Sequence, residues 1–111
     1  MMPKTLRPTL RERNRYLVFE MVTDANVNRK QAVDAIWGSL LRMYGEAGAA
    51  KTSMWVMDYE PAKKKGILKV NHMSANMLRA CITVVTNISG RKARIDVLKT
   101  SGTLRKAREN L

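Results

Sequence analysis

Few side chains in this sequence have the chemistry of a catalyst. The chain has one histidine, His72, and one cysteine, Cys81. It contains none of the spacings that arrange a nucleophile, a zinc site or a phosphate-binding loop, such as HExxH, GxSxG or GxGxxG. Its acidic residues do not form a close motif. We therefore predict that the chain has no catalytic residue and binds neither a metal nor another cofactor of its own.

Positive charge is the abundant chemical feature. The chain of 111 residues holds 21 Lys and Arg against 9 Asp and Glu, a formal net charge of +12. Residues 1–16 contain five basic residues and one acidic residue, and residues 91–111 contain seven and two. Charge of this size indicates a polyanionic partner. Arginine predominates at both ends and its guanidinium binds phosphate through two hydrogen bonds, so we favour RNA contact over the alternative of two solvated tails.

The two rare residues have simpler expected roles. Cys81 falls on an apolar helical stripe and is expected to be buried, and a single cysteine excludes an internal disulfide. His72 follows a predicted strand and precedes a helix, so we expect it to form a hydrogen bond or a cap. Contact of His72 with RNA is the alternative.

Four segments rich in β-branched and aromatic residues are predicted to be strands. A basic turn joins the second strand to the third, which are close enough in sequence to form a hairpin. The four strands span residues 15–22, 51–60, 66–72 and 91–100.

Two helices are predicted from apolar residues at helical spacing. The first follows Asn28, which can cap it with Gln31 as capping-box partner, and two glycines are available to end it. The second is predicted to run from Ser74 to Gly90, although its stretch ITVVTNI is β-branched and also suits a strand. A short basic helix is expected within 103–111.

This order of elements, β-α-β-β-α-β, predicts an α+β fold of the ferredoxin-like type, a four-stranded antiparallel sheet with both helices on one face. With 45% hydrophobic residues the chain can bury a core, and we predict one domain over residues 1–111. Residues 1–14 form its basic N-terminal segment and 101–111 its basic C-terminal tail or helix. The strands are apolar on both faces, so the terminal helix, a protein partner, a second copy or RNA should cover the second face.

The RNA-recognition motif shares this order of elements but requires stacking aromatic residues on its two central strands. The third strand here has Leu68, Val70 and His72 or their neighbours at those positions, and the first offers only Tyr16 and Phe19. Base stacking on the sheet is therefore poorly supported. We predict instead that the chain grips structured RNA through its phosphates.

Four stretches resemble one known family. The opening TLRPTLRERNRYLVFEMV, the helix AIWGSLLRMYGEAG, the strand GILKVNH and the ending VLKTSGTLRKARENL are similar, in order and spacing, to the archaeal and eukaryotic ribonuclease P protein component 2 family. The resemblance covers essentially the whole chain. The opening lacks the adjacent Pro pair usual in the family, and Val70 stands where many relatives have Cys.

The resemblance implies a noncatalytic subunit of ribonuclease P, the ribonucleoprotein enzyme that removes the 5′ leader of precursor tRNA by Mg²⁺-dependent chemistry of its RNA. It implies an RNA-recognition-motif-like fold with extra helices. The implied partners are the ribonuclease P RNA, precursor tRNA within the complex, the TIM-barrel-like component 3 and other ribonuclease P subunits, and a homodimer or a heterotetramer remains open. The alternative is a general basic RNA-binding or ribosome-associated module of ferredoxin-like fold.

The expected RNA contacts combine the charge pattern with this analogy. For the basic residues of the second turn and third strand, a solvated surface is the alternative. The predicted RNA-binding residues are Arg7, Arg11, Arg13, Arg15, Lys63, Lys64, Lys65, Lys69, Arg91, Lys92, Arg94 and Arg105.

We also expect a cytoplasmic protein with no membrane partner, because no apolar run approaches the roughly 18–20 residues of a membrane span and the start lacks a secretory signal.

Overall fold

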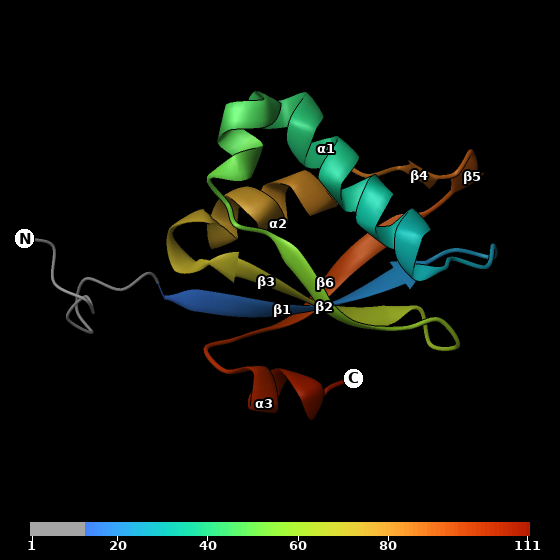
Figure 1. The fold of residues 1–111 in the computed structure, drawn as a ribbon. Helices are drawn as coiled ribbons and strands as arrows, with labels where there is room; N and C mark the ends of the chain where they lie inside the picture. Colours follow the sequence, from blue (N-terminus) through green and yellow to red (C-terminus); the bar gives the residue numbers. More distant parts are fainter. Residues whose placement is uncertain (1–12) are drawn as a thin grey trace, which may run out of the picture.

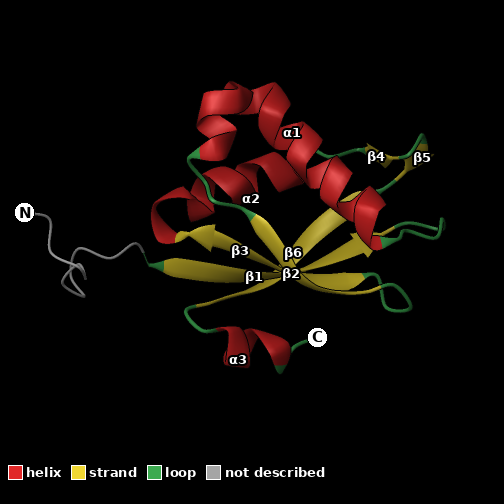
Figure 2. Ribbon diagram, viewed as in Figure 1, coloured by secondary structure: helices red, strands yellow, loops and turns green. Residues whose placement is uncertain are grey.

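The chain folds into a four-stranded antiparallel sheet with helices on both faces, in a computed structural model that describes residues 13–111 (Figures 1 and 2). The strand order is β2-β3-β1-β6, which together with the order along the chain confirms the predicted ferredoxin-like arrangement. The sheet and its first helical layer consist of β1 (Asn14–Val22), α1 (Arg29–Ala50), β2 (Trp55–Glu60), β3 (Lys65–Asn71), α2 (Ala75–Thr83) and β6 (Arg94–Ser101).

The start of α1 shows the predicted capping box. The side chain of Asn28 accepts a hydrogen bond from the Gln31 amide at 2.8 Å, and Gln31 Oε1 accepts one from the Asn28 amide at 3.0 Å. Gly45, one of the two glycines expected to end the helix, has φ +72° and interrupts it, after which helical residues continue to Ala50. β2 begins later than predicted because the segment 51–53 forms a turn.

The prediction that the second helix continues to Gly90 is wrong. α2 ends at Thr83, and the β-branched residues that follow lose side-chain freedom in a helix. Val85 and Ile88 nevertheless lie buried in the main core. Their helical spacing therefore reflects burial, and it does not report the backbone conformation of this stretch.

A small hairpin replaces the end of the predicted helix. β4 (Asn87–Ile88) pairs antiparallel with β5 (Arg91–Lys92). The two residues between them, Ser89 and Gly90, have φ of +53° and +80°, as in the two-residue turns that match the twist of a hairpin. β5 is separate from β6, so the predicted fourth strand is divided in two.

The main core lies between the sheet and the layer formed by α1 and α2. Alternate residues of the central strand β1, Leu17, Phe19 and Met21, point into it and are buried. The rings of Phe19 and Tyr59 stack with centroids 6.3 Å apart. Gly66 pairs with both residues across the sheet, and its lack of a side chain leaves room for the Phe19 ring.

The terminal helix α3 (Leu104–Arg108) covers the opposite face of the sheet (Figure 1). Val18 from β1, Ile67 from β3 and Ala107 from α3 form a second buried cluster there, separate from the main core. The terminal helix, one of the alternatives given above for covering this face, therefore lies on it. The helix is shorter than the predicted segment 103–111.

Candidate nucleic-acid interface

The predicted basic residues divide between the two ends of the sheet. Arg7 and Arg11 lie outside the described residues. We call the end where β1 begins, β3 finishes and β6 finishes the proximal end, and the end where β1 finishes the distal end. The turn between β2 and β3 and the β4–β5 hairpin both lie at the distal end (Figure 1).

Five basic residues lie toward the proximal end, on both faces of the sheet, and we call them the proximal patch. Strand register places Lys69 opposite Tyr16 and Lys99 opposite Val18. Arg79 reaches the same end from α2, where its Nη1 donates a 3.1 Å hydrogen bond to Thr100 Oγ1. The members of the patch are Arg13, Arg15, Lys69, Arg79 and Lys99.

Two members of the proximal patch were not among the predicted RNA-binding residues. Arg79 lies in the second predicted helix, and Lys99 lies in the charged C-terminal region 91–111. The signal that identifies Lys99 is strand register, because it sits near the end of β6 and directly across from β1. α3 also starts from this end, and its predicted residue Arg105 is exposed.

The cations of the proximal patch are not paired with carboxylates within residues 13–111. Cations without such partners keep their full charge for an incoming phosphate. The salt bridges of the described residues all lie elsewhere: Lys30–Asp34, Arg94–Asp96 and Arg108–Asp58.

His72 forms a hydrogen bond to the residue before β1 at this end. Its amide donates a 2.7 Å hydrogen bond to the Arg13 carbonyl oxygen, and its ring Nδ1 lies 3.3 Å from the same oxygen. The side chain of Asn71 accepts a hydrogen bond from the Ser74 amide at 2.9 Å, which turns the chain into α2. His72 thus has the predicted hydrogen-bonding role, and this contact fixes the backbone from which Arg13 projects.

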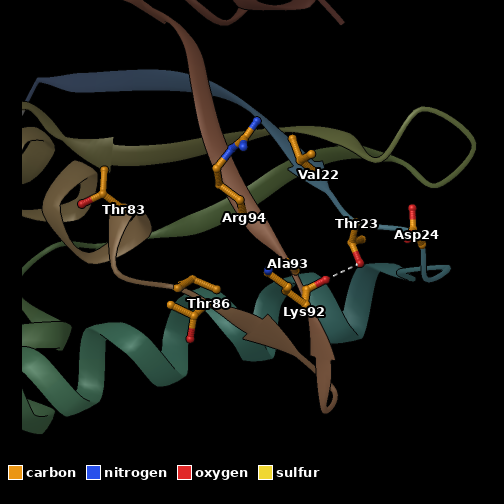
Figure 3. A pocket seen from close by; sticks show the side chains of 9 residues that line it. Val22, Thr23, Asp24, Thr83, Thr86, Lys92, Ala93 and Arg94 are labelled. Atoms are coloured by element: carbon orange, nitrogen blue, oxygen red, sulfur yellow. Dashed lines mark hydrogen bonds between the residues drawn. The ribbon is translucent and has the colours of Figure 1, made fainter.

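The distal end carries a depression of about 620 Å³ between the finish of β1, the finish of α2 and the β5–β6 connection (Figure 3). Its lining combines apolar residues and threonines with two predicted basic residues, Lys92 and Arg94. Thr23 Oγ1 donates a 2.9 Å hydrogen bond to the Lys92 carbonyl across it. Lys63 and Lys64 line a second depression on the other side of the β1 terminus.

Several distal cations are already engaged inside the protein. Lys64 Nζ donates a 2.7 Å hydrogen bond to the Thr23 carbonyl. The guanidinium of Arg94 holds both carboxylate oxygens of Asp96, at 2.9 and 3.2 Å, and this hydrogen bond raises the pKa of Arg94. Asp24 adds an acidic group to the lining of the larger depression. The distal end is therefore the weaker candidate for phosphate contact.

Comparison with known proteins gives the family. The profile of the Rpp14/Pop5 family matches residues 15–111. The chain belongs to the Rpp14/Pop5 family. It is 36% identical over 104 residues to Ribonuclease P protein component 2 of Pyrococcus furiosus, which covers 94% of this chain and 87% of that protein. The protein of the same name from Methanosarcina barkeri is 33% identical, with 96% and 77% covered.

A solved structure supports the fold of this Rpp14/Pop5 chain. One chain in the cryo-EM structure of yeast Ribonuclease MRP has a TM-score of 0.71 and 15% sequence identity, and the match covers 93% of this chain and 80% of that chain. At this identity the likeness concerns the fold. The α+β architecture predicted from the sequence is therefore shared with a chain of that particle.

The single thiol of this Rpp14/Pop5 chain lies in its interior. Cys81 is fully buried in the main core, and burial raises the pKa of its thiol, so the nucleophilic thiolate is disfavoured.

Across residues 13–111 no group of three or more His, Cys, Asp or Glu side chains is arranged to hold a metal ion. The helices in this range are also too short or too polar to cross a membrane.

Proposed function

We propose that this chain is a noncatalytic protein subunit of ribonuclease P that binds the ribonuclease P RNA and supports its Mg²⁺-dependent removal of the 5′ leader from precursor tRNA. The observation that carries the proposal is membership of the Rpp14/Pop5 family with 36% identity to a protein named Ribonuclease P protein component 2. In this role the chain supplies positive charge and a scaffold, and the Mg²⁺ belongs to the RNA.

The proximal patch is the surface that we assign to RNA. Its cations lie on or beside β1, β3, α2 and β6, and those elements are fixed to one another by the sheet and the main core. A rigid group of cations matches the fixed spacing of phosphates in structured RNA better than side chains on separate flexible tails. Arg7 and Arg11 lie outside the described residues and stay RNA contacts predicted from the sequence.

The covered sheet face supports phosphate contact over base stacking. In an RNA-recognition motif the bases stack on the open face of the sheet. Here α3 packs on that face, with Val18 and Ile67 buried beneath it and Tyr16 half-buried beside them. RNA bound to the folded chain therefore meets the rim of the sheet, where the arginines and lysines lie.

In the assembled particle we expect the chain to contact the ribonuclease P RNA and protein subunits, among them component 3, with precursor tRNA bound in the same complex in the cytoplasm. The expected assembly is a homodimer of this chain or a heterotetramer with component 3. Size-exclusion chromatography of the purified proteins, alone and mixed, measures the stoichiometry.

Reconstitution tests the proposed function. Ribonuclease P RNA, Mg²⁺ and the other protein subunits are combined with or without this chain, and the rate of precursor tRNA cleavage is measured. We expect omission of the chain to lower the rate. A rate that does not change on omission would overturn the proposal, and recovery of ribosomal RNA with the chain purified from cells would favour the general RNA-binding module.

A further inference from the structure

The surface beside the edge strand β2 is apolar and contains both tryptophans of the chain. It forms a groove of about 440 Å³ between α1 and β2. Trp55 stands at its edge with 62% of its surface exposed, which is unusual for so large an apolar side chain. RNA bound through its phosphates would not explain an apolar groove with an exposed tryptophan. The groove is lined by Arg29, Val33, Trp37, Met54, Trp55 and Val56.

The edge of β2 is closed to an added strand at this groove. The Arg29 guanidinium donates a hydrogen bond to the Val56 carbonyl, an acceptor that a pairing strand would need. The pairing of β2 with β3 also shifts register between Val56 and Asp58, which bends the edge. An occupant must therefore insert side chains into the groove and cannot extend the sheet through it.

The chemistry of the walls favours an apolar side chain over a nucleobase. Val33, Trp37 and Met54 offer hydrocarbon and aromatic surface. Arg29 is the charged lining residue: its Nη2 donates to the Val56 carbonyl, and the guanidinium, which has further donors but no acceptor, suits a carboxylate and cannot pair with the N–H groups of a base. A base would bury polar edges without partners here, at a free-energy cost that an apolar side chain avoids.

The surroundings of the groove are positively charged. Arg29 lies in its lining, and Lys69 is the cross-strand neighbour of Trp55. No lining residue is acidic, and the nearby Asp34 lines a different depression on the other flank of α1. A second copy of a chain with net charge +12 would bring like charges together at this place. Charge complementarity thus indicates a partner with carboxylates around its apolar anchor.

We propose that this groove docks a segment of another protein, which inserts an apolar or aromatic side chain between Trp37 and Trp55 and places carboxylates near Arg29. Tryptophan and arginine are the residue types that most often dominate binding at protein interfaces. The inference rests on the proposed function in one respect only: the first partner proteins to be tested are the other protein subunits of the same ribonucleoprotein.

The first test compares complexes purified from cells through a tag on this chain. The variants are Trp55→Glu, which changes an exposed residue, and Arg29→Glu, which reverses the charge in the first turn of α1, where an acidic residue suits the helix. The matched control is Val84→Glu, which places the same charge on another exposed apolar residue, 53% exposed, directly after α2 at the distal end, away from both the groove and the proximal patch. Circular dichroism and thermal melting confirm that each variant is folded.

We expect both groove variants to lose one identified protein subunit by about tenfold or more, as for a central interface residue, while the RNA stays within about twofold of the wild type. The control should retain both. Retention of every protein subunit in Trp55→Glu would overturn the inference. Loss of RNA with proteins retained would also overturn it and assign the groove to nucleic acid. If the complex lacks ribonuclease P RNA even with the wild-type chain, the proposed function fails, and the groove is still judged by the loss of a protein.

The second test uses the tryptophans as their own probe. The purified chain is titrated with the protein subunit identified in the first test and, separately, with ribonuclease P RNA, with the emission of each partner alone subtracted. Because both tryptophans line the groove, we expect a blue shift of emission with the protein and none with the RNA. Arg29→Lys should bind like the wild type, and Arg29→Glu about tenfold more weakly. A shift produced by RNA, or equal binding by Arg29→Lys and Arg29→Glu, would contradict the proposal.

Discussion

At the scale of single residues, Gly66 has the least room for change. A Cβ at this position would lie 2.5 Å from a ring carbon of Phe19 and 2.8 Å from the Asp58 carbonyl oxygen. Because a strand backbone cannot retreat easily, Gly66→Ala should lower the free energy of unfolding by about 1–3 kcal/mol in urea denaturation. Gly38→Ala is the control, since its nearest neighbour is the flexible end of Arg42 at 3.5 Å, and it should gain about 0.5–1 kcal/mol. Equal losses in the two variants would refute this account.

Tyr59 links the stability of the fold to alkaline pH. Burial raises the pKa of its hydroxyl above the ordinary value of 10.0, and the hydroxyl donates a 2.7 Å hydrogen bond to the Val27 carbonyl. Above pH 10 the unfolded chain releases this proton before the folded chain does, so the free energy of unfolding should fall as pH rises further. Tyr59→Phe should remove part of this fall, and Tyr44→Phe, at an exposed position, should not. Urea denaturation from pH 8 to pH 11 measures it, and identical slopes in all three proteins would contradict the prediction.

The sequence predicted which residue types would contact RNA, but it could not show which of the basic side chains are already paired with carboxylates. Arg13, Arg15 and Lys69 were expected RNA contacts, and the structure brings them together at the proximal end. Arg94 was expected on the same grounds, yet its guanidinium is held by Asp96. Which cation stays unpaired depends on the residues that face it within and across strands, and the sheet fixes this through a register that shifts along β1 and β2.

At the scale of elements, α3 is attached mainly by a few apolar side chains. Ala107 is fully buried against Val18 and Ile67. A carboxylate in place of Ala107 would be buried without a partner, so Ala107→Asp should detach α3 and leave the main core folded. We expect faster amide hydrogen exchange in α3 and increased binding of an apolar dye to the uncovered sheet. Lys106→Asp, at the exposed neighbouring position, is the control, and an equal response in both variants would refute this role of α3.

Local and nonlocal elements differed in how well the sequence predicted them. The capping box of α1 depends on residues three positions apart, and it was predicted correctly. The β4–β5 hairpin depends on contacts from outside it, such as the hydrogen bond from Thr23 Oγ1 to the Lys92 carbonyl. Ile88 within it and Val85 before it are buried and also fit a helical spacing, so the pattern of the segment could not distinguish the two conformations.

At the scale of the whole molecule, the structure gives the positive charge and the apolar surface separate positions that meet at one residue. Lys69 belongs to the proximal patch and is also the cross-strand neighbour of Trp55 at the groove. RNA on the patch and a protein in the groove would therefore be neighbours on one side of the chain. The distal end, where cations are bound internally and carboxylates are close, is left for weaker contacts. Because the two ends differ in this way, mutations can test which cations of this chain of net charge +12 contact RNA.

The salt dependence of RNA binding measures that location. Each phosphate contact that is lost should lower the slope of log affinity against log salt by about 0.7–0.9, so the triple variant Arg13→Ala, Arg15→Ala and Arg79→Ala should flatten it by about 2–3. The distal pair Arg91→Ala and Lys92→Ala changes exposed hairpin residues of the same charge and should leave the slope nearly unchanged. Filter binding to ribonuclease P RNA over a series of salt concentrations gives both slopes. An unchanged slope in the triple variant would place those arginines in solvent, and equal flattening by the distal pair would show that the RNA contacts both ends of the sheet.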